Sequence, residues 1–122
     1  MGRLPWLRRL GPCHIETHIL DRWQVIQVCG RFSGDRGKKG LLAEVDRLLG
    51  AGRRQLVVDL SEARLNDDSV AAAAPEAYRR ACAAGADMRF VVLPGRAGGF
   101  YHMAGLEMTL PTFTRLRDAV AA

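Results

Sequence analysis

The spacing of apolar and polar residues changes along the chain, and each change predicts a different element. Residues 13–21 alternate between apolar and polar side chains, as the residues of a half-buried β-strand do. A short turn at Asp21 and Arg22 leads into residues 23–29, which are rich in β-forming side chains. The two segments together predict a β-hairpin.

Beyond the hairpin, helical spacing alternates with short apolar runs. A polar, glycine-bearing loop over residues 30–37 precedes a helix from Lys39 to Gly50. The runs at 55–60 and 88–93 are typical of strands buried in a parallel sheet. The remaining predicted elements are an alanine-rich helix from Ser69 to Ala84 that bends at Pro75, a short helix over 97–104, an edge strand over 108–110, and a last helix beginning at Thr112 or Thr114.

A hairpin followed by strand–helix repeats predicts an α/β fold. The sheet is expected to be mixed, antiparallel at its start and parallel afterwards, with about four helices packed against it. At 122 residues the chain is expected to form one domain. We place this domain at residues 13–122, after a basic leader over residues 1–12 that we expect to be flexible.

Composition narrows the class of protein. No apolar run reaches the roughly 18 residues of a membrane-spanning helix, and the leader lacks the apolar centre of a secretory signal, which predicts a cytoplasmic protein. The net charge of +5 is scattered rather than gathered in a basic stripe, so we expect no nucleic-acid partner. Three cysteines without a C-x-x-C pair argue against a disulfide framework or a zinc site.

The segment from Val58 to Val70 resembles the signature of the STAS family, the sulfate transporter and anti-sigma factor antagonist domain. It contains Asp59-Leu60-Ser61 at the end of the predicted strand and Asp67-Asp68-Ser69-Val70 at the start of the next helix. The family has Asp-Ser-Ser-Gly at the second place. The resemblance extends over roughly residues 13–122 and includes Gly105-Leu106-Glu107 near the end of the chain.

The resemblance implies a regulatory site at the helix start. In family members that antagonise anti-sigma factors, a partner kinase phosphorylates the Ser after the Asp, and only the dephosphorylated form binds that partner. Asp67 matches the Asp, whereas Asp68 replaces the phosphorylated Ser, Ser69 matches the next Ser and Val70 replaces the Gly. Asp68 is then either an ordinary helix N-cap or a permanently charged, partial substitute for phosphoserine. Ser69 is the candidate for phosphorylation if the register shifts by one.

A second departure lies in the loop after the second strand. The family often has Gly-Glu-Leu-Asp at this place, and this chain has Gly30-Arg31-Phe32-Ser33. In the family the loop borders the partner-binding surface, so Arg31 in place of Glu changes the charge that a partner must present. The predicted partner-binding residues are therefore Gly30, Arg31, Phe32, Ser33, Asp67, Asp68, Ser69 and Val70.

The function implied is a regulatory protein-binding module without a catalytic site or cofactor. Its expected partner is an anti-sigma factor or a related kinase-like regulatory protein. The alternative is a cytoplasmic STAS accessory subunit of a membrane transport system, of the ABC or anion type, that binds a transporter ATPase. Such a subunit would reach the membrane through its partner or through the basic leader with Trp6. A third hypothesis, phosphoryl transfer on Asp59, Asp67 and Asp68, lacks a phosphate-binding loop.

A metal site on the first strand is not expected. His14, Glu16 and His18 share one face of this strand. Residues four apart on a strand are about 13 Å apart, whereas zinc holds its ligands at about 2 Å. Both histidines therefore cannot bind one ion, and these residues are read as the polar face of an edge strand.

Overall fold

The computed structural model describes residues 9–121. Its five strands form one sheet in the order β1-β2-β3-β4-β5, in which β1 runs antiparallel to β2 and all later pairs are parallel. The strands are β1 (His14–Leu20), β2 (Trp23–Arg31), β3 (Gln55–Arg64), β4 (Asp87–Val91) and β5 (Thr112–Phe113). The α-helices are α2 (Gly34–Gly50), α3 (Ser69–Ala83), α4 (Gly99–Met103) and α5 (Leu116–Ala121), and short 3-10 helices span Gly95–Gly98 and Leu106–Met108. The predicted mixed α/β sheet is confirmed.

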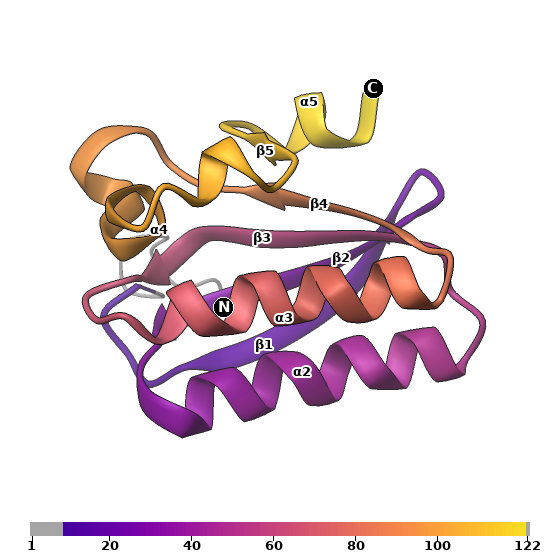
Figure 1. The fold of residues 1–122 in the computed structure, drawn as a ribbon, viewed down its shortest axis with the longest axis horizontal. Helices are drawn as coiled ribbons and strands as arrows, with labels where there is room; N and C mark the ends of the chain where they lie inside the picture. Colours follow the sequence, from indigo (N-terminus) through magenta and orange to yellow (C-terminus); the bar gives the residue numbers. More distant parts are fainter. Residues whose placement is uncertain (1–8, 122) are drawn as a thin grey trace, which may run out of the picture.

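The two faces of the sheet are covered differently. Helices α2 and α3 lie side by side over one face (Figure 1), where α2 buries Leu41, Val45 and Leu48 against the strands. On the other face, α5 packs its Ala119 into a smaller cluster that includes Trp23. Because side chains alternate along a strand, each strand supplies residues to both faces.

The loop predicted over residues 30–37 is wrong over most of its length. Strand β2 continues to Arg31, which pairs with Arg64 of β3, and α2 begins at Gly34. Phe32 is fully buried and its ring lies against Gly37 on the first turn of α2. The hydrophobic spacing missed this turn because glycines occupy positions where the helix approaches the core.

The end of the sheet also differs from the prediction. Residues 108–110 form no strand; Leu106–Met108 is a 3-10 helix, and the edge strand is Thr112–Phe113. The N–H groups of Phe90 and Val92 donate to the carbonyls of Pro111 and Phe113, which fixes the edge strand at these later residues. The last helix accordingly begins at Leu116 rather than at either threonine.

The alanine-rich helix begins at Ser69, as predicted, and Pro75 lies within it. Proline lacks an N–H group, so one backbone bond of the helix is lost at this point. The helix is nevertheless held by buried contacts of Val70, Ala73 and Ala77 with the core. Tertiary packing therefore overrides the local preference of the proline.

Arg89 connects the last helix to the sheet, so its replacement should lower the stability of the fold. Its guanidinium donates to the carbonyl of Ala119 at 2.7 Å and lies 4.4 Å from the centre of the Trp23 ring. We expect Arg89→Ala to lower the free energy of unfolding by about 1 kcal/mol, as measured by urea denaturation. Arg89→Lys, which keeps the charge but not the planar fork, should recover part of this loss. Equal stability of Arg89→Ala and the parent chain would contradict this role.

Candidate functional site

The predicted site residues come together at one end of the sheet, where the parallel strands β2 and β3 end and helices α2 and α3 begin (Figure 1). Ligands of open α/β sheets commonly bind outside the carboxyl ends of the strands. The segment after β3 and the segment after β2 are far apart in sequence, and the fold places them beside each other. We call the surface formed by residues 31–38 and 67–72 the helix-start surface.

Asp67 joins the two helix starts. Its Oδ1 accepts the backbone N–H of Ser69 at 2.9 Å, and its carboxylate also accepts the Ser69 hydroxyl and the backbone N–H of Gly34. The Ser69 hydroxyl and the two backbone bonds lower the pKa of Asp67 below its ordinary value, against the opposing effect of partial burial. One carboxylate thus satisfies backbone donors at the starts of both α2 and α3.

Asp68 does not cap its helix as an ordinary N-cap residue would. It occupies the N-cap position of α3, but its side chain accepts no capping hydrogen bond and is exposed. The capping bond comes instead from Asp67, one residue earlier. The carboxylate of Asp68 is therefore a free surface charge beside the start of α3, where the helix dipole favours it.

The two residues that follow have different environments. Ser69 is partly exposed, and its hydroxyl is engaged by Asp67. Val70 is buried with a relative exposure of 1 % and belongs to the main core. The residue that replaces the family's glycine therefore anchors the start of α3 from inside.

Backbone contacts hold the segment Gly30–Ser33 in place at the helix-start surface. Gly30 has φ of 85°, and a Cβ atom at this position would lie 2.3 Å from the carbonyl oxygen of Pro12, so only glycine fits. The N–H of Arg31 donates to the carbonyl of Gly11, and that of Phe32 donates to Arg64. Among these residues only Arg31 is exposed, with Ser33 partly so.

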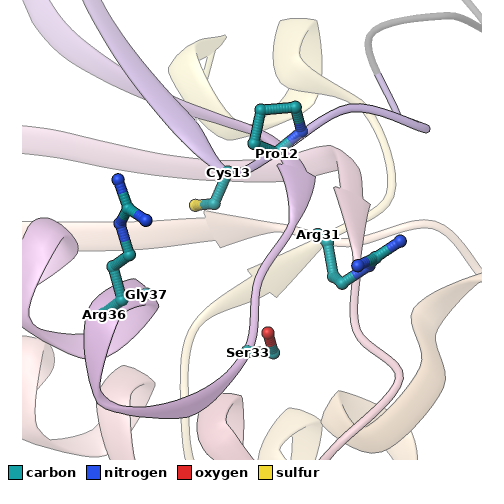
Figure 2. A pocket seen from close by; sticks show the side chains of 6 residues that line it. All are labelled: Pro12, Cys13, Arg31, Ser33, Arg36 and Gly37. Carbon is teal, nitrogen blue, oxygen red and sulfur yellow. The ribbon is translucent and has the colours of Figure 1, made fainter.

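Two shallow hollows flank the start of α2. One, of about 280 Å³, is lined by Gly34, Asp35, Lys38, Asp68, Ser69 and Ala72. The other, of about 230 Å³, is lined by Pro12, Cys13, Arg31, Ser33, Arg36 and Gly37. Figure 2 shows the Cys13 thiol turned toward the side of Arg36, while Arg31 extends to the opposite side. Burial raises the pKa of Cys13, and the charge of Arg36 opposes this effect only in part.

The helix-start surface is therefore divided by charge. Asp35 and Asp68 line the hollow between α2 and α3 together with one basic residue, Lys38, whereas the charged residues of the hollow toward β1 are Arg31 and Arg36. The sequence assigned Arg31 to the partner-binding surface, within a docking loop that extends to Asp35, but it did not assign Arg36 or Lys38 to this surface. The signal was present: Ser33 followed by Asp35 is a common start of a helix.

The acidic group suggested for phosphoryl transfer does not form. Asp59 is 3 % exposed, and its Oδ1 accepts the backbone N–H of Ser61 at 2.9 Å. By strand alternation it shares the sheet face of Val57, opposite to α2 and α3, whereas Asp67 contacts the starts of those helices. Within residues 9–121, these aspartates make no cluster able to hold a metal ion. The convergence of Asp59 with Asp67 and Asp68 on which that hypothesis depends is therefore not found.

The transporter hypothesis depends in part on the basic leader, which the structure mostly does not describe. Trp6 and most of the basic leader fall outside the described residues. Over the part of the chain that the structure describes, no helix combines the length and apolar character needed to cross a bilayer.

Comparison with solved structures identifies the fold. An anti-sigma factor antagonist from Mycobacterium paratuberculosis is similar with a TM-score of 0.76 and 20% sequence identity, over 89% of this chain and 92% of that one. The anti-sigma factor antagonist SpoIIAA in its unphosphorylated form is similar with a TM-score of 0.66 and 9% identity, over 88% and 94% of the two chains. The chain has the fold of the anti-sigma factor antagonists. This agrees with the resemblance of residues 58–70 to the STAS signature. No protein-family model and no curated protein sequence matches the chain.

Proposed function

We propose that the chain is a non-catalytic regulatory module that binds another protein through the helix-start surface. The observation that carries this proposal is the pair of helix starts joined by Asp67, which holds the exposed Asp68 in a fixed position. The fold shared with anti-sigma factor antagonists supports it. The partner would be an anti-sigma factor or a related kinase-like regulatory protein in the cytoplasm.

The charge pattern of the surface defines what such a partner must present. A partner would meet the acidic pair Asp35 and Asp68 between α2 and α3, and the basic pair Arg31 and Arg36 toward β1. Complementary charges select partners more by excluding wrong ones than by adding affinity. A partner suited to this chain would therefore carry basic and acidic patches side by side.

The position of Asp68 suggests a fixed rather than a switched charge. Its carboxylate is exposed and takes no part in capping, so it is available to a partner. A phosphate on the neighbouring Ser69 would lie beside two carboxylates and would remove the hydroxyl bond to Asp67. Phosphorylation at Ser69 would thus loosen the joint between α2 and α3 and weaken partner binding.

The test is to capture the partner and then to change one charge. The purified chain is immobilised, native lysate is passed over it, and retained proteins are identified by mass spectrometry. The retained regulator is then produced alone, and its affinity is measured by calorimetry. We expect Asp68→Arg to weaken binding at least about tenfold, since reversing a contacting charge introduces repulsion.

Asp118→Arg provides the matched control. Asp118 is an exposed acidic residue on α5, away from the helix-start surface, and its reversal changes the net charge equally. It should leave the affinity unchanged. Asp68→Ser and Asp68→Ala test whether the charge itself sets the binding state. Unchanged affinity for these two and for Asp68→Arg would refute the proposal, and retention of a transporter ATPase would favour the alternative function.

A further inference from the structure

The sheet face opposite to α2 and α3 carries a group of potential metal ligands outside the helix-start surface. His14 and Glu16 lie on β1, and Cys29 lies on β2 directly opposite His14 in the antiparallel register. One ligand atom from each of these three side chains lies within 4.8 Å of the other two. The Nε2 atom of His14 is 2.9 Å from a carboxylate oxygen of Glu16.

A carboxylate of the next strand accepts a bond from the Cys29 thiol. Glu62 of β3 pairs with Cys29 in the parallel register, and its Oε2 lies 3.7 Å from the Cys29 sulfur. Its other oxygen accepts a bond from the Gln27 side-chain amide at 3.4 Å, which orients the carboxylate. One imidazole, one thiol and one carboxylate thus converge across β1 and β2, and the Glu62 carboxylate of β3 lies beside the thiol.

We propose that His14, Glu16 and Cys29 form a binding site for Zn²⁺ or a similar transition-metal ion, with Glu62 next to the Cys29 ligand. Ligand atoms bound to one tetrahedral zinc ion lie about 3.3–3.8 Å from one another, given bond lengths of about 2.0–2.3 Å. The ligand atoms of the three residues lie within 4.8 Å of one another, so movements of about 1 Å would bring them to this range. A thiolate with an imidazole and a carboxylate suits zinc rather than magnesium or calcium.

The site depends on residues across the strands rather than along one of them. His14 and His18 are too far apart on β1 to share an ion. The hairpin instead brings His14 against Cys29, which is 15 residues away in sequence. Spacing along the sequence shows no such pairing, and the three cysteines form no zinc motif.

The three ligands differ in burial in a way that suits metal binding. Cys29 is fully buried, whereas the side chains of His14 and Glu16 are 40% and 51% exposed, so an ion can enter from the solvent side. Glu16, Cys29 and Glu62 also make other interactions in the structure. Binding would also displace the proton of the Cys29 thiol, so the affinity should fall as the pH is lowered.

Cobalt absorption gives a direct test. The untagged full chain, stripped with chelator and reduced, is titrated with Co²⁺ alone. We expect one Co²⁺ per chain, visible absorption typical of tetrahedral cobalt, and a near-ultraviolet thiolate-to-cobalt band that Zn²⁺ abolishes by displacement. Cys29→Ser should abolish the thiolate band, and His14→Ala should weaken Co²⁺ affinity at least about tenfold.

Matched controls distinguish the site from surface binding. His18→Ala removes the histidine on the same strand face, and Cys82→Ser removes an exposed cysteine; both should leave the spectrum unchanged. Glu16→Ala, at an exposed position, should reduce the rise of about 5 °C or more in Tm that saturating Zn²⁺ gives the parent chain. Absence of the thiolate band in the parent chain, or its persistence in Cys29→Ser, would overturn the proposal.

Discussion

Tyr101→Ala is expected to lower the free energy of unfolding by about 3–5 kcal/mol, because it removes a large side chain from a fully buried position. The ring lies 6.2 Å from that of Phe90 between centroids, and it packs edge-on against His102. Its hydroxyl lies 2.5 Å from the Thr112 hydroxyl, which itself donates to the carbonyl of Leu110, so Tyr101 is the donor. Urea denaturation measures the loss.

Tyr101→Phe distinguishes the contribution of the ring from that of the hydroxyl group. It should cost only about 1 kcal/mol, since the packing remains and one hydrogen bond is lost. Burial raises the pKa of Tyr101 to about 12, above an ordinary value of 10.0. The neutral form is therefore favoured by folding, and its contribution is complete below pH 10 and is lost as the pH rises toward 12.

The alkaline loss of stability should accordingly be smaller in Tyr101→Phe than in the parent chain. Measurements at pH 8 and across the window from 10 to 12 compare the two. An equally steep alkaline loss in both would show that Tyr101 does not ionise in this window. Near-native stability of Tyr101→Ala would show that α4 does not depend on this anchor.

Asp67→Ala is expected to cost about 1–2 kcal/mol, because it removes the acceptor for backbone N–H groups at two helix starts. Asp68→Ala is the matched control, since the Asp68 side chain makes no capping bond, and it should be nearly neutral. Asp67→Asn keeps an oxygen acceptor and should recover most of the loss. Unfolding of the three variants in urea gives the comparison.

The contribution of Asp67 to the free energy of unfolding should fall at low pH. The folded chain lowers the pKa of Asp67 below its ordinary value of 3.8, so its carboxylate stabilises the fold above that pH. The contribution is lost as the pH falls through the lower, folded pKa. The difference between the parent chain and Asp67→Asn should therefore shrink in acid. If Asp68→Ala were the more damaging variant, the assignment of the cap would be wrong.

Variants of Asp67 and Asp68 should distinguish a loss of stability from a loss of partner binding. Asp67→Ala should weaken partner binding by loosening the helix-start surface, and stability should fall with it. Asp68→Arg should weaken binding with little change of stability. If Asp68→Arg lowered stability and partner affinity together, as Asp67→Ala should, the result would count against the proposed role of the Asp68 charge.

The sequence by itself determined the order and type of most elements. Alternation over residues 13–21, helical spacing around Leu41 and Val45, and the apolar runs at 55–60 and 88–93 were sufficient, because burial of one face imposes a period on the chain. The motif at Asp67–Val70 located one side of the helix-start surface. These are local signals, carried by residues close together in sequence.

Only the tertiary structure decided what depends on distant contacts. The first turn of α2 is set by Phe32 packing on Gly37, and the place of β5 by carbonyls that accept from β4. Asp67 rather than Asp68 caps α3 because its carboxylate accepts the Ser69 N–H, and the same carboxylate reaches the start of α2. The pairing of His14 with Cys29 arises from hairpin register. Such contacts join residues far apart in the chain, and no period or motif along the sequence records them.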